Sequence, residues 1–98
     1  MNRVISFHSA AEREIIDAVS YFYTQRPELG AAFIDQVELA IQQILAYPLS
    51  SPLVNRTVRR KVLKRLPYDI LYSVQPERVR ILAIASQRRR PFYWRGRV

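Results

Sequence analysis

Residues 69–86 read Asp-Ile-Leu-Tyr-Ser-Val-Gln-Pro-Glu-Arg-Val-Arg-Ile-Leu-Ala-Ile-Ala-Ser. Polar and apolar side chains alternate loosely through residues 69–75, which is typical of a strand. Residues 79–86 are apolar on both faces, as expected for a strand in the interior of a sheet. Between them, Gln75-Pro76-Glu77-Arg78 places proline at the second position of a turn, which suits a tight hairpin. This stretch therefore predicts two strands joined as an antiparallel pair.

Two more strands are expected upstream. Residues 58–65, Val-Arg-Arg-Lys-Val-Leu-Lys-Arg, are extended and charged, and residues 2–7, Asn-Arg-Val-Ile-Ser-Phe, form a short opening strand. Residues 48–57 are interpreted as the one long loop, a connector within the domain.

A first helix is predicted to begin at Ser9, because Glu12 follows at the spacing of a capping box. Its acidic residues suit the helix dipole; they are Glu12, Glu14 and Asp17. Apolar residues recur at helical spacing along one face; they are Ala11, Ile15, Val19 and Phe22. Pro27 ends this pattern.

A second helix is expected from about Glu28 to Tyr47, before Pro48. Its apolar stripe consists of Leu29, Phe33, Val37, Ala40, Ile44 and Tyr47. Two helices joined so briefly must lie antiparallel, and each buries one face, so a sheet is needed as the second layer. The predicted fold is α+β in the order β-α-α-β-β-β, a helical hairpin packed on one small, mainly antiparallel sheet.

The composition restricts the class of protein. A chain of 98 residues has room for a single domain, residues 1–98. It contains no cysteine, which removes disulfides and thiolate metal sites and is compatible with a reducing cytoplasm. The N-terminus turns polar too soon for a signal peptide, and no apolar run is long enough to span a membrane. We expect a cytoplasmic protein with no metal and no cofactor.

Charge is segregated along the chain. Residues 1–50 contain three basic and six acidic side chains, and residues 51–98 contain thirteen basic and two acidic ones, so the halves carry −3 and +11. A field of this polarity favours an acidic or polyanionic partner and speeds the encounter with it. A basic surface that serves only solubility is the simpler alternative, although solubility does not require segregation by half.

The cations of the strand at 58–65 are expected on both of its faces. Alternation places Arg59, Lys61 and Arg65 with Leu63, and Arg60 and Lys64 with Val58 and Val62. Neighbouring cations on one face lie about 7 Å apart, close to the phosphate spacing of a nucleic-acid strand. The alternative is an edge strand that charge protects against aggregation.

The C-terminal segment, residues 87–97, reads Gln-Arg-Arg-Arg-Pro-Phe-Tyr-Trp-Arg-Gly-Arg. Guanidinium groups bind phosphate or carboxylate in bidentate fashion, and aromatic rings among them can stack on a base or pack on a protein. Anchoring to the core is the alternative for Phe92 and Trp94, but it does not explain five arginines. We predict a target-binding surface from both segments: Arg59, Arg60, Lys61, Lys64, Arg65, Arg88, Arg89, Arg90, Tyr93, Trp94, Arg95 and Arg97.

Catalytic constellations are sparse. The single histidine, His8, lies beside the first helix and is expected to be structural, and no glycine-rich phosphate loop exists. An enzyme built from these residues would be a metal-free phosphodiesterase, in which lysine or tyrosine moves protons and arginine stabilises the transition state. The candidates are Lys61, Lys64, Tyr68, Tyr72, Arg88 and Tyr93.

Several segments together resemble the RelE/ParE superfamily of bacterial toxins. They are Val58-Arg59-Arg60, residues 66–74 (Leu-Pro-Tyr-Asp-Ile-Leu-Tyr-Ser-Val), residues 79–85 (Val-Arg-Ile-Leu-Ala-Ile-Ala), Gln87-Arg88-Arg89-Arg90-Pro91 and Tyr93-Trp94. The turn Arg26-Pro27-Glu28-Leu29-Gly30, followed by Phe33, is similar to the turn between the helices of that family. The resemblance covers nearly the whole chain, and the arginine-rich end with its tryptophan is the most specific element.

The resemblance implies a toxin of a type II toxin–antitoxin pair, of the kind often labelled plasmid stabilisation proteins. A small antitoxin from the same operon neutralises such toxins by wrapping their surface. RelE-like members cut messenger RNA in the ribosomal decoding site, whereas ParE-like members poison DNA gyrase and have no established hydrolytic chemistry.

The RelE-like nuclease residues are matched only in part. Those nucleases commonly have an arginine after the strand tyrosine, where this chain has Asp69, whose carboxylate would repel a scissile phosphate unless a neighbour neutralises it. Many plasmid-stabilisation members have a histidine where Ser86 stands. The resemblance matches their C-terminal arginine to Arg88, their tyrosine to Trp94 or, with a slip of one residue, Tyr93, and their lysines to Lys61 and Lys64.

We therefore favour a ParE-like toxin that inhibits DNA gyrase and binds a cognate antitoxin, with which it can form a hetero-oligomer. The first alternative is a ribosome-dependent endoribonuclease of RelE type, with Lys61, Lys64, Arg88 and Tyr93 as its catalytic residues. The second is a non-toxic module that binds nucleic acid or protein.

Overall fold

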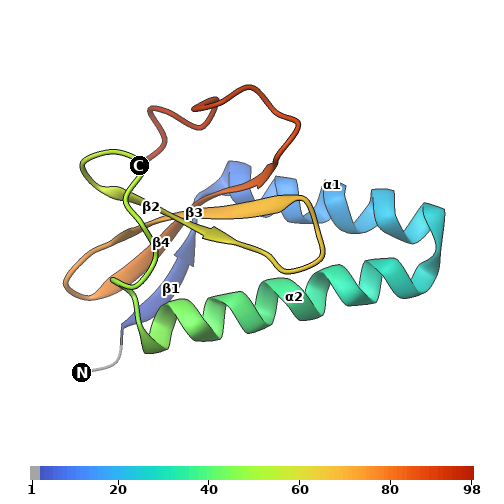
Figure 1. Ribbon diagram of the computed structural model, residues 1–98, viewed down its shortest axis with the longest axis horizontal. Coiled ribbons are helices and arrows are strands. Elements are labelled where there is room, and N and C mark those ends of the chain that lie inside the picture. Colours follow the sequence, from blue (N-terminus) through green and yellow to red (C-terminus); the bar gives the residue numbers. More distant parts are fainter. Residues whose placement is uncertain (1–2) are drawn as a thin grey trace.

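The computed structural model describes residues 3–98 as two helices on a four-stranded sheet (Figure 1). The elements are β1 (Val4–Phe7), α1 (Ser9–Gln25), α2 (Pro27–Ala46), β2 (Val58–Val62), β3 (Tyr68–Val74) and β4 (Arg78–Ser86). The predicted α+β fold and its element order are confirmed. Asn2, part of the predicted opening strand, lies outside the described residues.

The sheet has the strand order β1-β4-β3-β2. β2 and β4 pair antiparallel with β3, and β1 pairs parallel with β4. β4 is therefore an interior strand, as its two apolar faces predicted. The backbone N–H of Gln75 donates to the carbonyl of Arg78 at 2.8 Å and closes the predicted hairpin turn.

A bulge in β4 alters which side chains face each side of the sheet. Leu71 pairs with Ala83 and Tyr72 pairs with Ile81, so Leu82 is the extra residue. Consecutive side chains normally point to opposite faces, but here Leu82 and Ala83 both belong to one hydrophobic cluster. β4 thereby contributes to two cores, one on each face.

The helical hairpin covers one face of the sheet and encloses the larger core (Figure 1). Its buried side chains come from both helices and from β3 and β4; they include Ala11, Ala18, Phe33, Val37, Ala40, Ile44, Ile70, Tyr72, Ile81 and Ile84. The two predicted helical stripes are confirmed except at the two ends of the second, because Leu29 is only partly buried and does not pack against this core. Tyr47 is 72% exposed, because it is the C-cap residue of α2, where the chain leaves the helix.

The start of α1 differs from the prediction. His8 is the N-cap, and its Nδ1 accepts a hydrogen bond from the backbone N–H of Ala10 at 3.0 Å. Ser9 is already helical, so the predicted capping box is wrong. The backbone N–H of His8 donates to the carbonyl of Ile81 at 2.8 Å, so strand pairing sets the point at which the helix begins. The expected structural role of His8 is that of a cap.

β2 ends at Val62, three residues earlier than predicted. Leu63 leaves the strand to enter the helix-side core, and Arg65 takes a left-handed backbone conformation with φ 67°. Arg59 and Lys61 pair with Tyr72 and Ile70, so they share one face as predicted, and that face is the one covered by the helices. Lys64 and Arg65 instead belong to the β2–β3 loop, because the alternation of a strand does not continue through that turn.

The opposite face of the sheet carries the smaller core, called here the outer cluster. Its buried residues are Val58, Leu71, Leu82, Ala83, Ala85 and Trp94. Trp94 is the one member from outside the sheet, so the C-terminal segment covers this face (Figure 1). Within residues 3–98, neither helix is long and apolar enough to cross a membrane.

Candidate functional site

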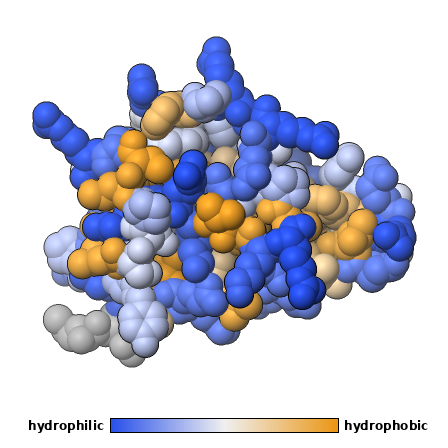
Figure 2. Space-filling model, viewed as in Figure 1, coloured by the Kyte–Doolittle hydropathy of each residue, from blue (hydrophilic) through white to orange (hydrophobic). Residues whose placement is uncertain are grey.

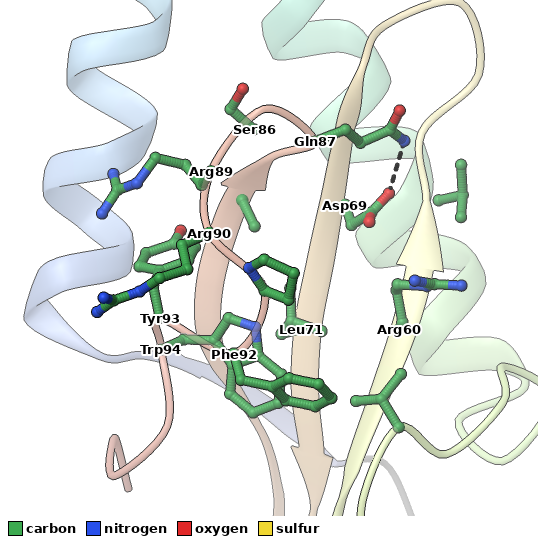
Figure 3. A pocket seen from close by; sticks show the side chains of 14 residues that line it. Arg60, Asp69, Leu71, Ser86, Gln87, Arg89, Arg90, Phe92, Tyr93 and Trp94 are labelled. Carbon is green, nitrogen blue, oxygen red and sulfur yellow. Dashed lines mark hydrogen bonds between the residues drawn. The ribbon is translucent and has the colours of Figure 1, made fainter.

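The C-terminal segment folds back over the sheet and forms one wall of a hollow. The backbone N–H of Gln87 donates to the carbonyl of Pro67 at 2.8 Å directly after β4, and Trp94 is buried in the outer cluster. Between these two anchors, the segment and the outer face of the sheet enclose about 330 Å³, called here the outer hollow (Figure 3). The hollow thus lies where two anchored parts of the chain meet.

The polar lining of the outer hollow comes from strands and segment alike. Arg60 on β2 lies on one side, and Arg89 and Arg90 lie on the other side, next to α1 (Figure 3). The amide Nε2 of Gln87 donates to Oδ1 of Asp69 at 2.9 Å. Asp69 therefore has a neutral hydrogen-bond donor, not a cation, as its observed partner.

The aromatic side chains of the segment differ in environment. Trp94 is 6% exposed, whereas Phe92 is 42% exposed and stands at a left-handed φ of 61°. The Tyr93 ring has the Arg89 guanidinium 4.0 Å from its centroid and the Arg97 guanidinium 5.1 Å from it. These cation–π contacts hold Tyr93 between two arginines. The expectation that one aromatic residue anchors the segment is confirmed by the burial of Trp94.

The Tyr93 hydroxyl is hydrogen-bonded to a carboxylate. It donates to Oε2 of Glu14 on α1 at 2.8 Å. Burial, this hydrogen bond and the negative charge of Glu14 raise the pKa of Tyr93 far above its ordinary value, and the two arginines oppose the shift without cancelling it. At neutral pH, Tyr93 is therefore a protonated phenol whose proton is already shared, which makes it a poor general base.

Arg88 lines a different hollow, which adjoins the outer hollow at Ser86. This second hollow of about 370 Å³, the helix-side hollow, is also lined by Tyr21, Phe22, Pro67, Tyr68 and Ser86. Burial raises the pKa of Tyr68, with a further contribution from Tyr21, and the nearby Arg88 charge opposes the increase. Among the described residues, Lys61 and Lys64 line neither hollow. The four nuclease candidates are thus not assembled around either space.

The sequence comparison decides the family. The family described as "ParE toxin of type II toxin-antitoxin system, parDE" matches residues 5–91.

The chain belongs to the ParE toxin family.

The resemblance that the sequence indicated is thereby confirmed at the level of this family. One solved structure, described as "Chromosomal ParDE TA system from P. aeruginosa", matches this ParE-family chain with a TM-score of 0.75 at 15% identity. The match covers 86% of this chain and 95% of that chain, and at this identity it shows a shared fold. No curated protein matches. Membership of a toxin–antitoxin family implies an antitoxin as partner.

Two of the predicted site residues hold the long loop of this ParE-family protein. The guanidinium of Arg59 donates to the carbonyls of Leu49 and Ser51 at 3.1 and 2.7 Å. Tyr72 is fully buried, and its hydroxyl donates to the carbonyl of Pro48 at 2.8 Å. Both side chains fix residues 48–57 against the sheet, which gives each a structural task.

Glu14 was not among the predicted site residues. It was interpreted only as one of the acidic residues that suit the helix dipole. A signal existed, because Glu14 lies three residues after Ala11 and four before Ala18, both buried, and therefore on the core-facing side of α1. A carboxylate on a buried helix face requires partners, but its partners here come from β4 and residues 93–97, which periodicity does not reveal.

Within residues 3–98, no group of three histidine, aspartate or glutamate side chains is placed to hold a metal ion.

Proposed function

We propose that this ParE-family chain is a growth-inhibiting toxin that binds an essential target, DNA gyrase in the favoured case, and does not cut RNA. The observation that carries this proposal is the separation of the nuclease candidates. Arg88 lines the helix-side hollow, whereas Tyr93 lines the outer hollow and donates a hydrogen bond to Glu14. Phosphodiester cleavage needs a proton-transfer group and a transition-state cation at one phosphate.

Asp69 supports the same choice. Its carboxylate lines the outer hollow and accepts from the uncharged amide of Gln87. Its negative charge offsets part of the positive charge of the arginines in the same hollow and so weakens the binding of a scissile phosphate there. A toxin that binds its target without cleaving it does not need to hold a scissile phosphate in this hollow.

The proposed target-binding surface consists of the outer hollow's rim and the C-terminal segment. The cationic side chains of Arg60, Arg88, Arg89, Arg90 and Arg95 are exposed. Figure 2 displays hydrophilic side chains projecting from the edge of the molecule where Figure 1 places the C-terminal segment. The half-exposed Phe92 adds an apolar contact among them. Exposed guanidinium groups around an aromatic ring suit a partner rich in carboxylates or phosphates.

A cognate antitoxin from the same operon would neutralise the toxin in the cytoplasm. An acidic antitoxin segment would be attracted to the residue 51–98 half, which carries +11. Covering the target-binding surface would prevent contact with gyrase.

Two measurements test this function. The chain is induced in bacteria with and without the neighbouring gene, and a DNA-damage reporter and total messenger RNA are followed. Purified protein is added to a supercoiling assay with DNA gyrase. We expect growth arrest, reporter induction, intact messages and loss of supercoiling, all reversed by the antitoxin. Unaffected growth with abundant folded protein would contradict the toxin function. Cleaved messages with normal supercoiling would replace gyrase inhibition by ribosome-dependent cleavage.

A further inference from the structure

Beyond the end of β1, the backbone of β4 is satisfied by side chains instead of by a strand. β1 pairs with β4 only as far as Phe7 and Ile81, whereas β4 continues to Ser86. The backbone N–H of Ile84 donates to Oε1 of Glu14 at 3.0 Å, and the carbonyl of Leu82 accepts from Nη1 of Arg97 at 3.0 Å. An ion pair therefore replaces a missing strand neighbour, which avoids unpaired backbone groups in a partly buried position.

The same two side chains join α1 to the C-terminal segment. Arg97 donates through Nη1 to Oε1 of Glu14 at 3.0 Å and through Nη2 to Oε2 at 3.1 Å. Tyr93 donates to the second oxygen as well. The side chains of Arg97 and Glu14 are only 18% and 14% exposed, so the pair is shielded from water. Shielding and bidentate geometry make such a pair stronger than an exposed one.

We propose that Glu14 is the positioning residue of the C-terminal arginine segment: it fixes residues 93–97, and thereby the exposed arginines beside them, in the arrangement that the target recognises. This inference rests on the proposed function, since it assigns target binding to that segment. Glu14 itself is 14% exposed and directed at Ile84, Tyr93 and Arg97. Its effect on the target is therefore exerted through the segment.

The other contacts of the C-terminal segment explain why a single carboxylate can determine its position. Trp94 and the Gln87–Pro67 hydrogen bond hold the segment at two points, but Tyr93, Arg95 and Arg97 follow tight turns with hydrogen bonds to Arg90, Phe92 and Trp94. Glu14 adds a contact from a different element, α1, on the far side of β4. Without it, the end of the segment would keep its local turns and the hydrogen bonds that join Arg97 and Val98 to β4, but it would lose both of its contacts with α1. Segments held by fewer such contacts open more readily.

The test compares Glu14→Gln with wild type, because glutamine keeps the size and one acceptor oxygen but places an NH₂ group against donors. Glu12→Gln serves as the matched control, since Glu12 lies exposed on the same helix and the change in charge is identical. Limited trypsin digestion under native conditions measures release of the segment, by cleavage after Arg88, Arg89 and Arg95. Cleavage after Lys64 in the β2–β3 loop measures general loosening of the same molecule.

We expect Glu14→Gln to raise cleavage in the C-terminal segment about tenfold relative to cleavage after Lys64, with Glu12→Gln unchanged. Inhibition of the target should weaken about tenfold in Glu14→Gln, since ordering the segment must then accompany binding. Wild-type cleavage ratios in Glu14→Gln would overturn the positioning role. So would a released segment with undiminished inhibition. The two readouts distinguish failure of this inference from failure of the proposed function. If the proposed function is wrong, wild-type protein does not inhibit gyrase, but the digestion still measures whether Glu14 holds the segment.

If Glu14→Gln accumulates poorly, Tyr93→Phe removes one donor from the segment side and leaves the carboxylate in place. We expect it to raise the cleavage ratio by a smaller factor than Glu14→Gln. A cleavage ratio equal to that of wild type in Tyr93→Phe would also count against the inference.

Discussion

Glu14 and Arg97 form a bidentate ion pair across 83 residues of sequence, with both Nη atoms 3.0–3.1 Å from the carboxylate. The pair also bonds to the backbone of β4, at Ile84 and Leu82. One contact thus joins the acidic helical half, the central strand and the basic C-terminal segment. In this ParE-family protein, one acidic residue of the helical half is thus paired with one arginine of the basic half. Most of the other arginines of the C-terminal segment stay exposed and can contact a partner.

The pH dependence of stability should contain a contribution from Tyr93. Because its folded-state pKa is raised above the unfolded value of about 10, the folded state keeps the proton to higher pH than the unfolded chain. The resulting stabilisation is complete below about pH 10 and is lost as pH rises further toward the folded-state pKa. We expect wild type to lose stability more steeply than Tyr93→Phe from pH 9 to 11, as measured by urea unfolding. Parallel curves would show that Tyr93 does not contribute.

Trp94 should stabilise the fold far more than Phe92 does. Trp94 is 6% exposed and Phe92 is 42% exposed, although their rings lie only 5.5 Å apart. We expect Trp94→Ala to cost about 3–5 kcal/mol of unfolding free energy, as is usual for a buried aromatic residue, and Phe92→Ala to cost less than about half of that. Chemical denaturation measures both. Equal losses would mean that the outer cluster does not depend on Trp94.

The helix-side core should depend on Phe33. Its ring is fully buried and packs 5.5 Å from Phe22 and 5.1 Å from Tyr68. Phe33→Ala should lower the free energy of unfolding by about 3–5 kcal/mol. The neighbouring Ile34 is 41% exposed and provides the control, since Ile34→Ala removes much less buried surface than Phe33→Ala. A melting temperature unchanged by Phe33→Ala would contradict the assignment of the core.

The two candidate caps of α1 can be separated by mutation. His8→Ala removes the acceptor for the N–H of Ala10 and should cost about 0.5–2 kcal/mol, whereas His8→Asn should retain most of the stability because asparagine caps well. Ser9→Ala should change stability by less than about 0.5 kcal/mol, because Ser9 is exposed and already helical. Thermal unfolding at neutral pH measures all three. A larger loss for Ser9→Ala than for His8→Ala would reverse the assignment.

Target binding should be sensitive to charge at the C-terminal segment and insensitive to charge on the helical hairpin. Arg90 and Arg95 are both exposed, and replacing both by glutamate should weaken gyrase inhibition by about tenfold or more, since rim charges govern encounter. The matched control, Arg13→Glu with Arg26→Glu, makes the same change in net charge at two exposed positions, one on α1 and one at the turn between the helices. Both double variants should unfold like wild type. Equal loss of inhibition in the two would indicate a net-charge effect instead of a defined surface.

Local patterns in the sequence were enough to predict the architecture. The period of the apolar residues in 9–47 and 69–86 encodes which side of each element is buried, and Pro27, Pro48 and Pro76 mark where elements meet. Each of these signals depends only on residues that are close together in the sequence. They therefore predicted the two helices, the hairpin of β3 and β4, and the interior position of β4.

Only the tertiary structure decided the contacts on which the candidate site depends. The helix cap is His8 and not Ser9, because the pairing of β1 with β4 extends to the backbone N–H of His8. The bulge at Leu82 directs two neighbouring side chains of β4 to the same face of the sheet. Tyr93 changed from a possible proton carrier to a fixed phenol because Glu14 lies 79 residues away in sequence but 2.8 Å away in space. A residue's neighbours in sequence indicate whether it is buried. Which partner meets it there depends on how whole elements pack, and that information is spread over the entire chain.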